Sequence, residues 1–157
     1  MPYAGLTAPQ LRTLCTGIYK EHQLTDSTAW QASVGELWRK AKVREERYAA
    51  IQLLQLPRYR KAWLNLDTIP LLRELIETGA WWDYVDNLAS NSMGYLLKAH
   101  PEEIKPLLYT WAEDPHLWIR RTALLAQLKF YADTDTDLLY TAIEHSLADE
   151  DFSHAKP

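Results

Sequence analysis

Apolar residues recur at the spacing of an α-helix along almost the whole chain. Residues three or four positions apart lie on one face of a helix. Two such stripes are Leu71, Leu72, Leu75 and Ile76, and Leu124, Leu128 and Tyr131. No stretch alternates between apolar and polar residues for long enough to form a β-strand. The pattern therefore predicts an all-α protein.

Capping and breaking residues divide this pattern into short helices. Gln10 follows Thr7 at the three-residue spacing of a capping box. We expect Asp67 to cap a helix that ends at Gly79. Pro101 stands where a further helix is expected to begin.

Three segments share one plan, in which an apolar helix and a short break precede a second helix. The second helices are anchored at Arg44, Trp82 and Trp118, which lie 38 and 36 positions apart. This spacing is close to the period of helix-pair solenoids. Each anchor has a partner on the same face, three or four residues later, in Arg47, Asp86 and Arg121. The repeat predicts one surface for all six residues; alternatively, the tryptophans pack in the core, where Trp is usually found.

Composition excludes several classes of protein. The 157 residues are 47% hydrophobic, which suits a single domain over residues 1–157. The five glycines are too dispersed for a phosphate-binding loop, and with one cysteine and no close histidine pair we predict no metal and no cofactor. No apolar run approaches the roughly 20 residues that span a bilayer, and the start of the chain lacks the features of a signal peptide. We expect a cytoplasmic protein without membrane contact.

The charge is unevenly distributed, although the net charge is only −4. Eight basic and two acidic residues fall between Arg39 and Lys61, whereas seven acidic residues and no Lys or Arg fall between Asp133 and Asp151. This polarity indicates a basic face that binds a polyanion. The alternative is a pair of solvated helix surfaces.

At these same positions the chain resembles the AlkD-type DNA glycosylases, a family of HEAT-like helical-repeat proteins. The segment Trp81–Asp86 resembles the family's WWDxVD motif, and the segment Asp114–Ala123 resembles its (N/D)xWxxRxA motif. Two weaker likenesses are the segment Arg44–Ala50 and an early element with Gly5, Leu6, Pro9 and Arg12. The likeness extends from Gly5 to about Lys156. It implies a solenoid of antiparallel helix pairs stacked into a curved, right-handed superhelix.

The resemblance also implies a function, which is hydrolysis of the N-glycosidic bond of purines alkylated at N3 or N7 in double-stranded DNA. Matched residue by residue, the catalytic group becomes Trp82, Asp86 and Arg121. The residues expected to contact DNA are Lys42, Arg44, Arg47, Trp118 and Arg120.

Elementary chemistry is consistent with this group. An alkylated purine already carries positive charge and leaves readily, so it needs little of the general acid that sugar hydrolases use. Its departure produces an oxocarbenium-like sugar, which a carboxylate and an indole face stabilise. We expect Asp86 to orient or deprotonate the attacking water. We expect Arg121 to keep Asp86 ionised and to contact a phosphate.

The chain departs from the family at both ends. It lacks an opening helical pair before Gly5, and Phe152 and Lys156 match the beginning of an FxxxKAxGW run that Pro157 ends. We therefore expect a truncated member without the family's second cleft aromatic. Uncapped terminal repeats expose apolar faces, which leads to the hypothesis of a homodimer through them. Two alternatives to a glycosylase stay open, namely a non-catalytic DNA-binding solenoid and a protein-interaction scaffold.

Overall fold

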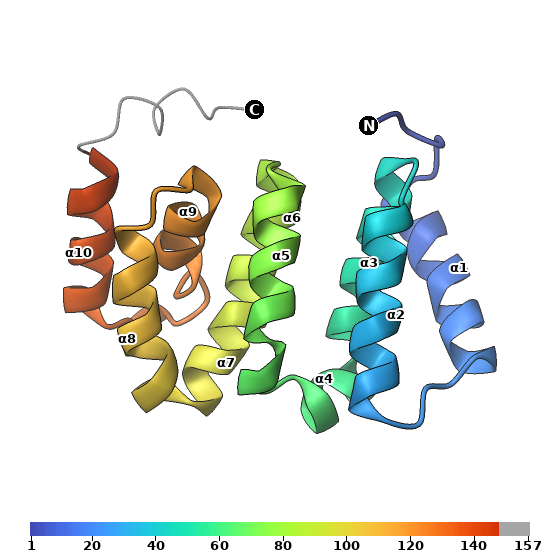
Figure 1. Ribbon diagram of the computed structural model, residues 1–157, viewed down its shortest axis with the longest axis horizontal. Coiled ribbons are helices and arrows are strands. Elements are labelled where there is room, and N and C mark those ends of the chain that lie inside the picture. The colour runs from blue at the N-terminus through green and yellow to red at the C-terminus, as the bar shows by residue number, and fades with distance from the viewer. Residues whose placement is uncertain (148–157) are drawn as a thin grey trace. The chain divides into compact units, whose positions relative to one another are not determined.

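The computed structural model describes residues 1–147. The chain divides into two compact units, residues Met1–Leu71 and Leu72–Pro157. Every regular element of the described residues is a helix, so the predicted all-α class is confirmed. The helices are short and arranged as a helical repeat, as the spacing of the anchors predicts (Figure 1).

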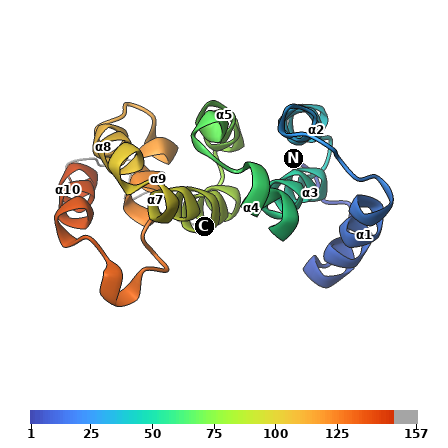
Figure 2. The ribbon, with the colours of Figure 1, turned by 90° about the horizontal axis from the view of Figure 1, so that it is seen from below.

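The first unit is built on an antiparallel helix pair. It contains α1 (Ala8–Glu21), α2 (Ser27–Lys40), α3 (Arg44–Gln55), α4 (Pro57–Trp63) and the 3-10 helix η1 (Leu66–Thr68). Helices α2 and α3 run antiparallel beside each other, and α1 packs against α3 (Figures 1 and 2). Trp30, Val34 and Trp38 of α2 are almost completely buried in this core.

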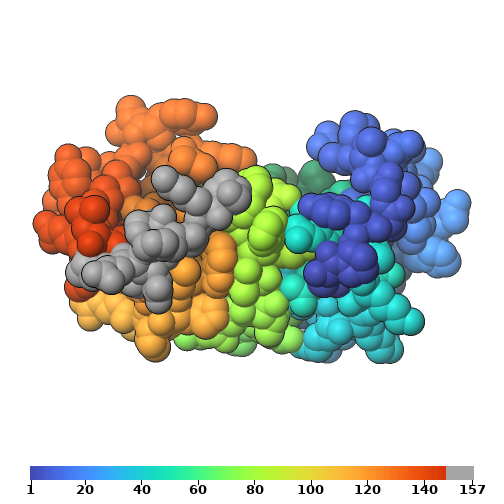
Figure 3. All heavy atoms as spheres, turned by 90° about the horizontal axis from the view of Figure 1, so that it is seen from above, coloured from blue at the N-terminus to red at the C-terminus, as the bar shows by residue number. Residues whose placement is uncertain are grey.

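The N-terminal segment is fixed to the start of α3 by one buried carboxylate. Glu45, only 3% exposed, accepts backbone N–H donors from Ala4, Gly5 and Leu6 at 2.9–3.2 Å. Gly5 has φ +91°, a left-handed conformation that favours glycine. Figure 3 shows this segment in dark blue, lying over the neighbouring helices of the first unit. Gly5 and Glu45 therefore take part in one structural contact between the N-terminal segment and α3.

The remaining helices belong to the second unit, which α5 enters from Ile69. They are α5 (Ile69–Gly79), α6 (Trp82–Asn87), the π-helical segment η2 (Leu88–Met93), α7 (Gly94–Ala99), α8 (Pro101–Ala112), α9 (Leu117–Leu125), the 3-10 helix η3 (Tyr131–Asp133) and α10 (Thr136–Leu147). Segments α6, η2 and α7 follow one another with helical backbone angles at both junctions. Helix α10 packs against α8 and α9 (Figure 1).

A glycine allows α7 to approach the end of α9 closely. A Cβ atom on Gly94 would lie 2.6 Å from the carbonyl oxygen of Ala126. The π-helical segment directly precedes this contact and follows the part of the helix that carries Asp86. A π turn changes which face of a helix points at a neighbour. The run from α6 to α7 therefore meets α9 at two places, through Asp86 and through Gly94.

Two expectations from the sequence are wrong. Asp67 does not cap α5, because it lies inside η1, where its backbone N–H donates to the Asn65 side chain at 3.0 Å. The helical stripe expected from Leu124, Leu128 and Tyr131 does not form, and Leu128 and Tyr131 are 60% and 84% exposed. The physical reason is that α9 ends at Leu125, so the helical spacing does not continue to those residues.

Candidate functional site

The predicted anchors lie in the first turns of the second helices. Helix α3 begins at Arg44 and α6 begins at Trp82, while α9 begins at Leu117, one residue before Trp118. Each partner then lies about one turn further along the same helix, as the spacing requires. The repeated arrangement of these residues is thus confirmed for each helix taken by itself.

Asp86 and Arg121 form a two-pronged ion pair between α6 and α9. The Arg121 Nε donates to Asp86 Oδ1 at 2.6 Å, and Nη2 donates to Oδ2 at 2.8 Å. The side chains are 30% and 22% exposed, so water reaches the pair without surrounding it. Bidentate arginine–carboxylate pairs are short, strong and fixed in orientation. The contact therefore holds one carboxylate in a defined direction near the surface of the second unit.

Trp82 lies one turn before Asp86 at the start of α6. Its ring is tilted by 45° against Trp81, with the ring centroids 6.2 Å apart. The residue is half-buried, and its Nε1 is buried without an acceptor among residues 1–147. Residues four apart stand one above the other on a helix. An aromatic surface and a carboxylate thus share one helical face, as predicted.

A second ion pair holds the loop before α9. Arg73 Nη2 of α5 donates to Asp114 Oδ2 at 2.7 Å, and Asp114 Oδ1 accepts the His116 backbone N–H at 2.8 Å. Arg120 Nη1 donates to the carbonyls of Asp114 and Pro115 at 2.8 and 3.0 Å. The hydrogen bond to Asp114 raises the pKa of Arg73 above its ordinary value. These contacts fix the loop from which α9 starts.

Sequence reasoning missed Arg73 and the role of Asp114. The two residues are 41 positions apart, and no local pattern connects them. Of the two, only the role of Asp114 could have been predicted from the sequence, because an aspartate two positions before a helix N-cap commonly accepts backbone N–H groups of the loop. Trp118, a predicted DNA contact, is half-buried on α9, one turn before the buried Thr122.

The three basic residues predicted to bind DNA in the first unit lie at the start of α3. Lys42 is exposed just before the helix. Arg44 donates through Nε to the carbonyl of Met1 at 3.1 Å and through Nη1 to the hydroxyl of Tyr3 at 3.1 Å. Arg47 lies over the ring of Trp38 at 4.6 Å. That these residues line one surface with those of the second unit stays a prediction.

Other predicted features fall outside these contacts. Phe152, Lys156 and Pro157 lie outside the described residues. Within residues 1–147, no group of three or more His, Cys, Asp or Glu is placed to hold a metal ion. None of the helices there combines the length and the apolar character that crossing a bilayer requires.

Comparison with known proteins gives one family and one fold. The family model described as DNA alkylation repair enzyme matches residues 1–156. A solved structure described as a predicted DNA alkylation repair enzyme from Enterococcus faecalis superposes with a TM-score of 0.79. It is 27% identical, and the match covers 94% of this chain and 67% of the other. No curated protein matches the chain.

The family match extends over both units and includes the helices that carry Trp82, Asp86 and Arg121. The structural neighbour has the same helical architecture over nearly the whole chain. The chain belongs to the DNA alkylation repair enzyme family.

Proposed function

We propose that the protein is a DNA glycosylase that hydrolyses the N-glycosidic bond of purines alkylated at N3 or N7 in duplex DNA. Membership of the family supports a role in DNA repair, with DNA as the partner. The observation that carries the finer proposal is the ion pair between Asp86 and Arg121, one helical turn from the ring of Trp82. Together the three side chains offer a fixed carboxylate and an aromatic surface at the edge of solvent.

This arrangement suits a reaction in which the leaving group is already activated. Alkylation at N3 or N7 gives the purine a positive charge, so the bond to the sugar breaks without a strong general acid. The deoxyribose becomes electron-deficient as the bond lengthens. A carboxylate held in place stabilises that charge more than a mobile one does, because it does not have to reorient during the reaction. The face of an indole adds a smaller cation–π attraction.

Asp86 has a second role in the proposal. After or during departure of the base, a water molecule must attack the sugar carbon. A carboxylate oxygen orients that water and accepts its proton. Arg121 occupies the same two oxygens from one side, so it limits the directions from which water and sugar can approach Asp86. Arg121 is thus a positioning residue for Asp86. Its contact with a phosphate uses only an N–H group that is not hydrogen-bonded to Asp86.

DNA binding is assigned to basic and aromatic residues around these helices. The proposed contacts are Lys42, Arg44, Arg47, Trp118 and Arg120. Phosphate contacts supply affinity that falls as salt rises, because bound counterions are released. Arg120 already donates to two loop carbonyls, so a phosphate there would use its remaining N–H groups.

The decisive experiment measures release of 7-methylguanine from methylated duplex DNA. Asp86→Asn keeps the shape of the side chain and removes the carboxylate, and we expect a loss of at least about 100-fold in the single-turnover rate. Asp83→Asn is the matched control, since it makes the same substitution in the same helix about 100° away from Trp82. We expect the control to release base at nearly the wild-type rate.

The other outcomes discriminate between the alternatives. Equal release by Asp86→Asn and wild type would exclude the catalytic role of Asp86. Salt-dependent binding of duplex DNA without any release of base would indicate a non-catalytic DNA-binding member of the family. Absence of DNA affinity even at low salt would indicate a protein-interaction scaffold, which is a common use of helical repeats.

A further inference from the structure

One arginine holds the first three residues of the chain, which we call the N-terminal arm. Arg44 donates through Nε to the carbonyl of Met1 and through Nη1 to the hydroxyl of Tyr3, each at 3.1 Å. Its guanidinium carbon lies 4.7 Å from the centroid of the Tyr3 ring. Its backbone N–H donates to the carbonyl of Pro2 at 2.9 Å. Every residue of the arm therefore contacts Arg44, a residue that we also propose as a DNA contact.

The arm is held less firmly than the residues that follow it. The N–H groups of residues 4–6 donate to the carboxylate of Glu45, which is only 3% exposed. Met1 and Tyr3, in contrast, are 44% and 64% exposed, and their hydrogen bonds with Arg44 lie at the surface. Hydrogen bonds there contribute little, because water competes for both partners. The arm can therefore give up Arg44 while Glu45 keeps residues 4–6 in place.

The oxygens that the arm offers to Arg44 are neutral. One belongs to a backbone carbonyl and one to a phenol hydroxyl. A phosphate oxygen carries negative charge, and its hydrogen bonds with a guanidinium are shorter and roughly twice as strong as those between neutral groups. An exchange of Met1 and Tyr3 for a phosphate thus replaces neutral acceptors of Arg44 with a charged one.

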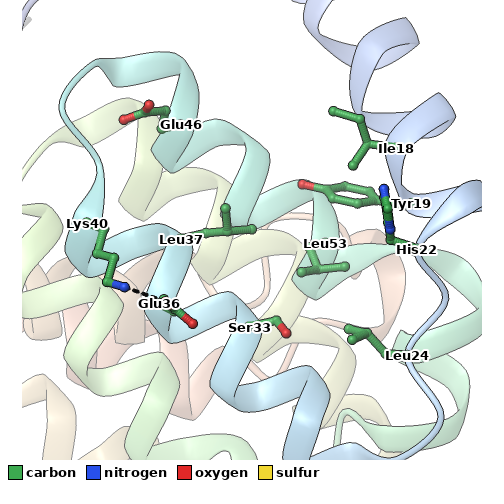
Figure 4. Close-up of a pocket in the computed structure, with 10 residues that line it drawn as sticks. All are labelled: Ile18, Tyr19, His22, Leu24, Ser33, Glu36, Leu37, Lys40, Glu46 and Leu53. Atoms are coloured by element: carbon green, nitrogen blue, oxygen red, sulfur yellow. Dashed lines mark hydrogen bonds and ion pairs between the residues drawn. The ribbon is translucent and has the colours of Figure 1, made fainter.

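Carboxylates near Arg44 in the sequence have partners outside the arm. Glu46, which Figure 4 shows in the first turn of α3, accepts the backbone N–H groups of residues 42–43. Glu36 pairs with Lys40, as the dashed line in Figure 4 marks. Release of the arm does not break these contacts. The exchange at Arg44 is therefore a local event at the start of α3.

We propose that the N-terminal arm is an autoinhibitory contact, which competes with a phosphate of duplex DNA for the guanidinium of Arg44. The N–H groups that bind Met1 and Tyr3 cannot bind a phosphate at the same time. DNA therefore gains its contact with Arg44 only after the arm has been displaced. This inference rests on the proposed function, because it takes Arg44 to be a DNA contact.

The population of the covered state sets the size of the effect. Apparent affinity is reduced by the fraction of molecules that are competent to bind, so an arm that covers Arg44 in about nine of ten molecules weakens binding about tenfold. An arm that covers about two of three weakens it about threefold. Two surface hydrogen bonds and one exposed cation–π contact suit this range. We expect loss of the arm's contacts to strengthen DNA binding by about three- to tenfold.

The first test measures the dissociation constant for an unmodified DNA duplex by fluorescence anisotropy, at one fixed salt concentration. Tyr3→Ala removes the hydroxyl and the ring from Arg44 and should strengthen binding by about three- to tenfold. Tyr3→Phe keeps the ring and should strengthen it less. Tyr140→Ala is the control, because Tyr140 is similarly exposed, at 60%, but lies in the second unit. Its affinity should match that of wild type.

The second test asks whether the arm acts through Arg44. Arg44→Gln should weaken binding and lower the slope of log affinity against log salt by about 0.9, the value for one phosphate contact. Tyr3→Ala alone should leave this slope unchanged, because the bound state keeps the same phosphate contacts. In the Arg44→Gln background, Tyr3→Ala should no longer change the affinity. A merely structural role of Tyr3 does not produce this dependence on Arg44.

The outcomes separate this inference from the proposed function. If Arg44→Gln weakens binding but Tyr3→Ala leaves it unchanged or weakens it too, the autoinhibitory contact is refuted and the DNA contact stands. A gain from Tyr3→Ala that persists without Arg44 also refutes the inference. If Arg44→Gln has no effect, or wild type does not bind duplex DNA, the DNA contact at Arg44 is refuted as well. Circular dichroism checks the fold of each variant, and Tyr3→Phe gives the direction of the effect if Tyr3→Ala loses helix.

Discussion

Asp86 and Arg121 stand 35 positions apart in the chain and meet through two hydrogen bonds of 2.6 and 2.8 Å. Each is presented by the second helix of its repeat, and each side chain is between one fifth and one third exposed. The pair ties α6 to α9 and at the same time aims a carboxylate at the surface. The structural role of this pair and its proposed chemical role thus depend on the same four atoms, Nε and Nη2 of Arg121 and the two carboxylate oxygens of Asp86.

The first prediction separates these two roles with a double-mutant cycle. Asp86→Asn, Arg121→Gln and the double variant should show a coupling free energy of about 1 kcal/mol in the free energy of unfolding, because the pair is directly hydrogen-bonded but partly solvated. Denaturation by urea measures it. The double variant should regain stability relative to the sum of the single changes and yet release no base. Additive single effects would contradict the pair's contribution to stability.

The second prediction concerns the ring of Trp82. Its Nε1 has no acceptor in the described part of the chain, so Trp82→Phe gives up no hydrogen bond there and should change the free energy of unfolding little. Trp82→Ala removes the aromatic face and should lower the rate of base release by at least about tenfold, the equivalent of about 1.4 kcal/mol of cation–π stabilisation. Single-turnover rates on methylated duplex are the measurement. If Trp82→Ala reacts like Trp82→Phe, the ring does not act on the sugar.

The third prediction concerns the loop that Asp114 holds. Asp114 is only 9% exposed, so Asp114→Asn should remove the more buried of the two carboxylates that pair with Arg73 and lower the free energy of unfolding by about 1–2 kcal/mol. Glu77→Gln is the control, since it disturbs the same arginine at a half-exposed pair on one helix. Such pairs contribute about 0.5 kcal/mol or less. Urea midpoints that shift equally for both variants would contradict the role of Asp114.

The fourth prediction compares two glycines inside helices. Gly94→Ala brings a methyl group within 2.6 Å of the Ala126 carbonyl, and we expect a loss of about 1–3 kcal/mol in the free energy of unfolding. Gly17→Ala meets open space and should increase stability by up to about 1 kcal/mol. Thermal melts of dilute protein test both. The same sign of effect for the two variants would refute this explanation of the packing at Gly94.

The fifth prediction is a dependence on pH through Glu45. Hydrogen bonds from the backbone N–H of Ala4 first, and then of Leu6 and Gly5, lower the pKa of the Glu45 carboxyl below its ordinary 4.5. The unfolded chain therefore takes up this proton more readily than the folded one. The stabilisation is fully present above pH about 4.5 and is lost as the pH falls through the lower folded pKa.

The measurement for Glu45 is the free energy of unfolding of wild type and Glu45→Gln between pH about 6 and about 3. Wild type should be the more stable protein at the upper end, and the difference between the two should shrink toward the lower end. A difference that stays constant across this range would show that the carboxylate charge is not what holds the N-terminal segment.

Local sequence was sufficient for the helical class and for the repeat, whereas the roles of the candidate site residues came from the family resemblance and stay a prediction. Helical spacing and capping residues act within a few positions, so Arg44, Trp82 and Trp118 could be assigned to the first turns of their helices. The spacing of Trp82 and Asp86 on one face follows from helix geometry alone. The residue pattern also placed Arg121 in the matching helix of the next repeat.

Contacts between distant helices required the folded chain. The pairing of Arg73 with Asp114, the approach of Gly94 to Ala126 and the π-helical turn after Asn87 depend on partners that no short segment specifies. For the same reason the spacing of Leu128 and Tyr131 was misleading, since a helix ends where its packing and capping end, and α9 ends at Leu125. Periodicity is a property of neighbours along the chain, whereas burial is decided by what the other helices bring into contact.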